Sequence, residues 1–105
     1  MYDIKLINPL VQFGYTHWTL TFEDATQQFP AIRLDKKYAD KTPTANIIAS
    51  VRATIESWCQ LETTPPPIFD DEGNFLHQDA GTFPDLAGST IQVFYAGGEI
   101  DLWQI

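Results

Sequence analysis

Hydrophobic and polar residues alternate along three short segments in the first third of the chain. The alternation is cleanest over residues 16–23, where every second side chain is large and apolar. Shorter runs of the same kind occupy residues 2–8, which Asn8 and Pro9 then interrupt, and residues 30–35. Because successive side chains of a strand point to opposite faces, this period of two predicts half-buried strands that form a meander.

The hydrophobic period changes in the middle of the chain. Apolar residues recur there at intervals of three and four, which is the spacing of one face of a helix. Pro43 suits a first helical turn, and the three prolines at 65–67 cannot continue a helix. The pattern therefore predicts one long helix over residues 43–60, with these side chains on its apolar face: Ile47, Ile48, Val51, Ile55 and Trp58.

Two strand-like runs, residues 89–96 and 99–105, lie on either side of Gly97 and Gly98. A two-residue glycine connection suits the positive φ angles of a tight hairpin turn. With that turn, Val93 faces Leu102 and the hairpin has one mostly apolar face. Its reverse face then holds two aromatic and two acidic side chains, and it is either buried under another element or exposed as a binding patch: Phe94, Glu99, Asp101 and Trp103.

Between the helix and this hairpin the chain turns acidic. Residues 68–69 and 75–77 flank the segment Asp70-Asp71-Glu72-Gly73-Asn74, which predicts a small hairpin or an ordered loop. Residues 79–88 are rich in Gly, Pro and Asp and predict irregular structure. The acidic segment fits a solvated turn, an irregular Ca²⁺ site or a contact point for a basic partner; its spacing does not fit an EF-hand.

The order of elements predicts the α+β class. We expect a single domain over residues 1–105, in which an antiparallel sheet of four to five strands packs on the long helix. The sheet combines the N-terminal meander with the C-terminal hairpin. The expected core residues are Trp18, Leu20, Phe22, Ile32, Leu34, Ile47, Val51, Ile55, Trp58, Ile91, Val93 and Leu102.

Charge divides the chain into two unequal halves. All six Lys and Arg residues lie at or before Arg52, together with five of the acidic residues, whereas residues 53–105 hold nine acidic residues and no basic one. A net charge of −8 disfavours direct binding to nucleic acid or to an acidic membrane. With no apolar run long enough for a membrane span and no signal-peptide pattern, we expect a soluble, cytoplasmic protein.

The residues that carry most enzyme chemistry are few and scattered. Cys59 lies near the carboxyl end of the predicted helix, where the helix dipole disfavours a thiolate, and one cysteine cannot form an internal disulfide. His17 and His77 lie far apart, although His77 and Asp79 are near neighbours. We therefore expect no catalytic residues, no metal and no cofactor.

These observations lead to two hypotheses about function. The first is a small acidic module or inhibitor that binds a basic protein surface, such as a phage-borne inhibitor of a host defence nuclease that mimics nucleic acid, or an immunity protein. The second is a structural or assembly subunit of a multimeric particle, such as a component of a phage, with self-association through the hairpin. If the fold sets the turn near Asp71 beside the hairpin near Asp101, the partner-binding residues form one surface: Asp70, Asp71, Glu72, Phe94, Glu99, Asp101 and Trp103. If the two point apart, the surplus of acidic residues serves mainly solubility.

Overall fold

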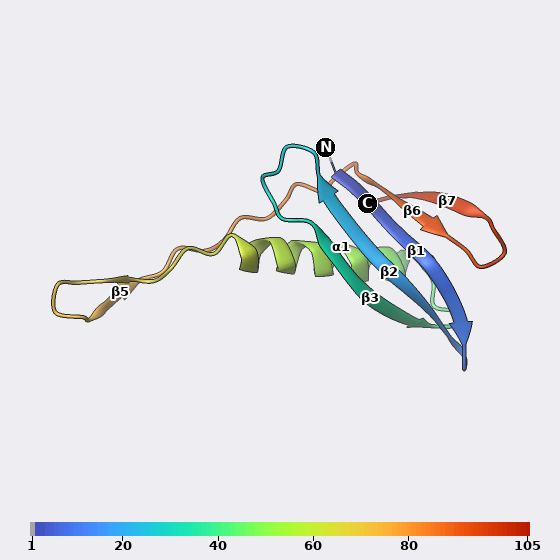
Figure 1. Cartoon of the computed structure of the whole chain (residues 1–105), viewed down its shortest axis with the longest axis horizontal. Helices are drawn as coiled ribbons and strands as arrows, with labels where there is room; N and C mark the ends of the chain where they lie inside the picture. The colour runs from blue at the N-terminus through green and yellow to red at the C-terminus, as the bar shows by residue number, and fades with distance from the viewer. Residues whose placement is uncertain (1) are drawn as a thin grey trace.

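Five strands form one sheet, and a single helix lies against one of its faces (Figure 1). The computed structural model describes residues 2–105. The strand order in the sheet is β3-β2-β1-β6-β7, and a separate pair, β4-β5, forms a small hairpin. The elements are β1 (Tyr2–Gln12), β2 (Tyr15–Asp24), β3 (Ile32–Ala39), α1 (Thr44–Glu62), β4 (Ile68–Phe69), β5 (Phe75–His77), β6 (Thr90–Phe94) and β7 (Ile100–Gln104).

The predicted α+β class is confirmed, with one difference in the sheet. The meander β1-β2-β3 and the pair β6-β7 are antiparallel, but β1 and β6 run parallel. The sheet is therefore mixed, whereas an antiparallel sheet was expected. The reason is the long connection through α1 and the segment after it, which brings the chain back to the same end of the sheet at which β1 began (Figure 1).

The first strand is longer than predicted because it passes through a bulge. The pairing of β1 with β2 shifts by one residue between Ile7 and Leu10. Asn8 takes a positive φ of 55° there, which asparagine tolerates better than most residues. Asn8 and Pro9 thus interrupt the ladder without ending the strand, and β1 continues to Gln12.

The third strand is also displaced from its predicted position. It spans Ile32–Ala39, so Lys36 and Lys37 belong to the strand instead of to a charged connection. Because β3 is an edge strand, its lysines can reach solvent, and charged side chains at an edge discourage pairing with other chains. The Nζ of Lys36 donates a hydrogen bond of 3.1 Å to Thr54 Oγ1 on the helix.

The helix begins one residue after Pro43 and extends to Glu62. Trp58 was expected in the core but is 38% exposed, so that expectation is wrong. The inward position one turn after Ile55 is taken by Cys59, which is fully buried. No helix within residues 2–105 is long and apolar enough to cross a membrane.

The β6-β7 turn uses only one glycine in a left-handed conformation. Gly98 has a φ of 94°, whereas Gly97 is not among the glycines with positive φ. The backbone N–H of Gly98 donates to the carbonyl of Tyr95 at 3.0 Å, and the N–H of Tyr95 donates to the carbonyl of Glu99 at 2.9 Å. This is a three-residue connection with a bulge, not the predicted two-residue turn.

The different turn moves the hairpin register by one residue. Val93 pairs with Asp101 and not with Leu102, so Leu102 lies on the face away from the helix and is 66% exposed. Its predicted place in the core is wrong. Trp103 instead pairs with Ile91 and packs against the core. Since a shift of one residue reverses every side chain, Phe94 and Trp103 lie on opposite faces of the hairpin.

The core fills the space between the sheet and α1. Leu34 is only partly buried and packs against this core, and the other predicted core positions outside Trp58 and Leu102 are buried. The sequence analysis did not assign Phe29 or Leu86 to the core. The buried apolar residues are Ile4, Leu6, Trp18, Leu20, Phe22, Phe29, Ile32, Ile47, Ile48, Val51, Ile55, Cys59, Leu86, Ile91 and Val93.

A projecting arm, residues 65–79, extends away from the sheet and helix. It continues from the end of α1, carries β4 and β5, and forms the left end of the molecule in Figure 1. The molecule measures 61 × 30 × 19 Å, and the arm accounts for its elongation. The three prolines at its base favour an extended path and cannot donate hydrogen bonds to neighbouring strands.

Candidate protein interface

The predicted partner-binding residues lie at two ends of the molecule. Asp70, Asp71 and Glu72 form the turn of the arm, whereas Glu99 and Asp101 belong to the β6-β7 hairpin at the other end of the longest axis (Figure 1). The fold therefore does not bring the two acidic groups together into one surface. A compact acidic site that combines them is excluded by this arrangement.

The aromatic residues of the β6-β7 hairpin do not form a shared patch either. Trp103 is partly buried against the core, while Phe94 lies on the sheet face that α1 leaves uncovered. The carbonyl of Phe94 accepts a hydrogen bond of 2.8 Å from Trp18 Nε1. Trp103 is therefore partly buried, as in the first alternative for this face, and Phe94 pairs with Ile100 across β6 and β7.

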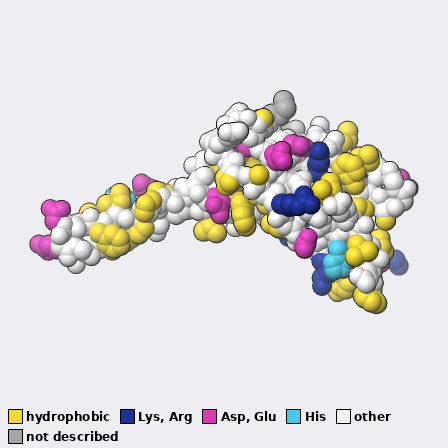
Figure 2. Space-filling view, in the orientation of Figure 1, with side chains coloured by type: hydrophobic (Ala, Val, Ile, Leu, Met, Phe, Trp, Pro, Cys, Tyr) yellow, Lys and Arg dark blue, Asp and Glu magenta, His cyan; other side chains and the backbone are white. Residues whose placement is uncertain are grey.

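The arm carries an apolar surface that residues 2–105 leave uncovered. Phe69 and Phe75 make an edge-to-face contact, with ring centroids 6.1 Å apart and an angle of 75° between the rings. Figure 2 shows hydrophobic side chains along the arm and acidic ones at its end. The exposed fractions of its four large apolar side chains are Ile68 44%, Phe69 54%, Phe75 60% and Leu76 56%.

Asp70 builds the turn at the end of the arm. Its Oδ1 accepts hydrogen bonds from the backbone N–H groups of Asn74 at 2.8 Å and Glu72 at 2.9 Å. The hydrogen bond from the Asn74 backbone is the main cause that lowers the pKa of Asp70 below its ordinary value. Asp70 therefore has a structural role, and the carboxylates of Asp71 and Glu72 are left exposed in solvent.

The base of the arm is fixed to the end of the helix. Thr63 Oγ1 accepts a hydrogen bond of 2.6 Å from the backbone N–H of Thr82. Gly81 packs so closely on the carbonyl of Gln60 that a Cβ atom at position 81 would overlap it. These contacts join the segment that leads into the arm and the segment that returns from it, next to the end of α1.

A second exposed apolar group occurs where β1 meets β2, and the sequence analysis missed it. We call this group the tip: Leu10, Val11, Phe13 and Tyr15, with exposed fractions of 55%, 58%, 88% and 39%. Phe13 and Gly14 form a two-residue turn in which both have positive φ, 54° and 80°. A bulky residue in this conformation costs roughly 1–2 kcal/mol. The signal in the sequence was the Phe13-Gly14 pair between two alternating runs.

Basic side chains adjoin the tip. Lys37 pairs with His17 across β3 and β2, and its Nζ lies 4.6 Å from the centroid of the Tyr15 ring. Lys41 follows β3 and is exposed. The nearby carboxylate of Asp40 accepts a weak hydrogen bond of 3.5 Å from a threonine hydroxyl. In Figure 2 the lower right end of the molecule shows yellow, dark blue and cyan side chains together.

Groups with potential for catalysis or metal binding lie apart. Burial, and secondarily the charge of Asp24, raise the pKa of the Cys59 thiol to about 11, which keeps it protonated at neutral pH. His77 Nε2 and Asp79 Oδ1 are 3.8 Å apart on the exposed arm. Within residues 2–105 no group of three or more His, Cys, Asp or Glu side chains is placed to hold a metal ion.

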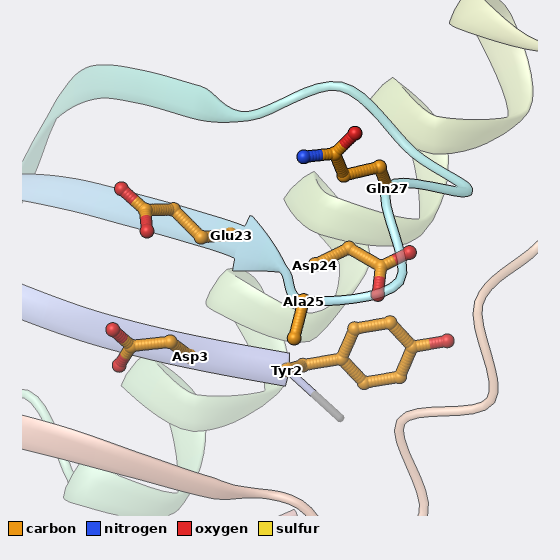
Figure 3. A pocket seen from close by; sticks show the side chains of 6 residues that line it. All are labelled: Tyr2, Asp3, Glu23, Asp24, Ala25 and Gln27. Carbon is orange, nitrogen blue, oxygen red and sulfur yellow. The ribbon is translucent and has the colours of Figure 1, made fainter.

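An open hollow lies where β1 begins and β2 ends (Figure 3). Asp3 and Glu23 face each other across the two strands, and Asp24 turns toward the following loop (Figure 3). Asp24 accepts hydrogen bonds from Thr26 and from the N–H groups of Gln28 and Phe29. The buried carboxylate is thus used to hold that loop, a structural role that the sequence analysis missed, although Asp-x-Thr is a pattern typical of such turns.

Comparisons with protein-family models, with curated proteins and with solved structures find no match to this chain.

Proposed function

We propose that this protein is a protein-binding module that works through its projecting arm. The observation that carries the proposal is the exposure of all four large apolar side chains of the β4-β5 hairpin, far from the core. The partner surface is apolar in its centre and basic at its rim. The arm replaces the combined acidic surface of the sequence hypothesis as the binding element.

The physical argument starts from the low intrinsic stability of an isolated hairpin. Two strands alone are marginally stable in water at best, because they bury too little apolar surface to offset their loss of conformational entropy. Contact with another protein removes the arm's apolar side chains from water. Burial of each half-exposed side chain contributes roughly 1 kcal/mol of favourable free energy. The rigid base at Thr63 and Gly81 reduces the entropy lost on binding.

Charge specifies the kind of partner. Residues 65–79 contain four acidic residues and no Lys or Arg. Asp71 and Glu72 lie at the free end, where they meet a partner first and favour a basic surface over an acidic one. An inhibitor of a nucleic-acid-binding protein is the narrowest form of this proposal, and it predicts that the protein and nucleic acid compete for one groove.

The test compares two pairs of charge-neutralising substitutions. Asp71→Asn with Glu72→Gln changes the arm, and Glu99→Gln with Asp101→Asn makes the same change in net charge at the other end. Tagged chains are incubated with extracts of the cells that produce the protein, and the retained proteins are identified and eluted with rising salt. We expect a specific basic protein that the arm variant loses at lower salt and the control variant keeps. Equal weakening by both pairs would show that total charge governs binding, and would contradict a role for the arm.

A second candidate function, an assembly subunit, is favoured by the tip. Its apolar side chains and adjoining lysines form an exposed surface at the other end of the molecule from the arm (Figure 2). A chain with one such surface at each end has the features needed for joining identical copies.

A further inference from the structure

We propose that the arm of one chain docks on the tip of a second copy, so that identical chains join end to end. This inference rests on the proposed function of the arm as a binding element and names its partner. The receiving surface is the tip with its adjoining lysines: Leu10, Tyr15 and Lys37 lie on one face of the β1-β2 hairpin and Val11 on the other, with Phe13 in the turn and Lys41 after β3.

The two surfaces match in apolar content. The arm offers Ile68, Phe69, Phe75 and Leu76, and the tip offers two aliphatic and two aromatic side chains; all eight are more than a third exposed. Exposed large apolar groups that gather at one place indicate a protein interaction surface, whereas isolated ones are ordinary. Aromatic side chains dominate the binding energy of many interfaces, and each of these two surfaces has two of them.

The two surfaces are also opposite in charge. The arm has four carboxylates and no Lys or Arg, whereas Lys37 and Lys41 outnumber the single nearby carboxylate, Asp40, at the tip. Two other basic side chains have acidic partners within the chain: Lys5 lies 3.5 Å from Asp3, and Arg52 lies 2.6 Å from Glu56. Since the whole chain carries −8, two copies repel each other in most orientations, and the tip is where a lysine-rich surface meets an acidic arm most favourably.

The conformation of Phe13 supports a role in binding. Its ring is 88% exposed, and its backbone takes a positive φ of 54°. Both the exposure and the backbone conformation are unfavourable in an isolated chain, and such strained positions gather at functional sites. Burial of this ring by the arm of a neighbour offsets both costs.

The geometry defines the type of assembly. The arm and the tip are different surfaces at the two ends of one elongated molecule (Figure 1). A contact between different surfaces is heterologous, so each added chain leaves one free arm and one free tip. The products are therefore open chains or closed rings, and their size rises with protein concentration.

The test uses two variants that each block one surface. The arm variant carries Phe69→Ser and Phe75→Ser, both at exposed positions that the core does not use. The tip variant carries Leu10→Ser and Phe13→Asn, because asparagine tolerates the left-handed conformation that position 13 requires. Circular dichroism and thermal melting establish that both variants fold, and sedimentation velocity over a wide range of concentrations measures their size.

We expect the unmodified chain to sediment faster as its concentration rises, and each variant to remain a monomer. An equimolar mixture of the two variants should form a complex with the mass of two chains and no larger, because one intact arm meets one intact tip. A monomeric unmodified chain, or variants that associate as the unmodified chain does, would overturn the inference.

A charge exchange tests the contact independently of the apolar side chains. Asp71→Lys with Glu72→Lys should abolish association, and so should Lys37→Glu with Lys41→Glu. The two charge-reversed variants mixed together should associate again. If the unmodified chain is monomeric while arm substitutions still release a different basic protein, the second-copy inference fails and the proposed function stands. If arm substitutions change neither self-association nor partner binding, both fail.

Discussion

The chain contains two hairpins with the same turn and different environments. Residues 70–74 and residues 95–99 close their hairpins with the same pair of backbone hydrogen bonds, and each has a glycine with positive φ in fourth place, Gly73 and Gly98. The β6-β7 hairpin extends the sheet and contributes Ile91 and Val93 to the core. The arm hairpin has all its strand residues exposed.

The comparison separates what a turn decides from what packing decides. The turn fixes the register and brings two strands together, but it does not determine whether any side chain is buried. Burial of β6 follows from its pairing with β1, which places Ile91 and Val93 over α1, whereas β7 is an edge strand of which only Trp103 is partly buried. The arm has no such neighbour within residues 2–105, so its apolar side chains are available for binding.

The largest expected difference between the hairpins is in the contribution of their apolar side chains to stability. Ile91 is fully buried, so Ile91→Ala should lower the free energy of unfolding by about 2–5 kcal/mol. Phe75 is 60% exposed, so Phe75→Ala should change it by less than about 0.5 kcal/mol. Urea unfolding at low protein concentration measures both values. A loss of stability in Phe75→Ala close to that in Ile91→Ala would show that the arm packs on the body in solution.

The sequence predicted this division between body and arm only in part. Alternation at Trp18, Leu20 and Phe22 correctly identified a half-buried strand, because one side of β2 faces the helix. The acidic segment correctly suggested a hairpin between residues 68–69 and 75–77. Neither pattern shows that the β4-β5 hairpin projects from the domain. Alternation of side chains along one strand does not indicate which other element packs on that strand.

The register of the β6-β7 hairpin was predicted wrongly because its turn was misidentified. Two adjacent glycines suggested a two-residue turn, but Gly98 alone takes a positive φ. The resulting shift of one residue exposed Leu102 and moved Trp103 to the core side. The candidate site was affected most, because its aromatic half depended on Phe94 and Trp103 sharing a face. The tip was missed because an exposed Phe13 in a left-handed conformation runs against residue preferences.

A substitution at the base of the arm tests how firmly the arm is attached to the end of α1. Gly81→Ala places a Cβ atom against the backbone carbonyl of Gln60. The end of α1 and the segment at residues 81–82 are joined by the hydrogen bonds of Thr63, and a movement that relieves the overlap would break them. We expect a loss of about 1–3 kcal/mol in the free energy of unfolding, the usual cost of overpacking. Urea unfolding checks the value, and unchanged stability would indicate that the base of the arm is loosely held.

A matched pair of glycine substitutions compares the two turns directly. Both Gly73 and Gly98 have open space where the Cβ atom of an alanine would lie, so alanine at either site is disfavoured by the positive φ alone. Gly98→Ala should lower the free energy of unfolding by about 1 kcal/mol, because the strain acts on a hairpin that packs on the core. Gly73→Ala should leave the free energy of global unfolding unchanged, because the arm turn can open while the rest of the domain stays folded. Equal losses in the two variants, measured by urea unfolding, would contradict independent behaviour of the arm.

The smallest expected effect concerns two carboxylates whose pKa values are both lowered. Burial raises the pKa of Asp24, but the combined hydrogen bonds from Thr26, Phe29 and Gln28 outweigh it, and hydrogen bonds within the turn lower the pKa of Asp70. A carboxylate with a lowered folded-state pKa stabilises the folded protein above the unfolded pKa of about 3.9, and this stabilisation is lost as the pH falls toward the folded value.

Asp24 holds a loop whose Phe29 belongs to the core, so its ionisation should affect global unfolding. Asp70 holds only the arm turn. Below about pH 5 the free energy of unfolding should decline less steeply in Asp24→Asn than in the unmodified chain. In Asp70→Asn the decline should be the same as in the unmodified chain. Urea unfolding at several pH values measures both. A flatter profile in Asp70→Asn would mean that the turn of the arm and the body unfold as one unit, and the distinction between the two hairpins would then apply to binding but not to stability.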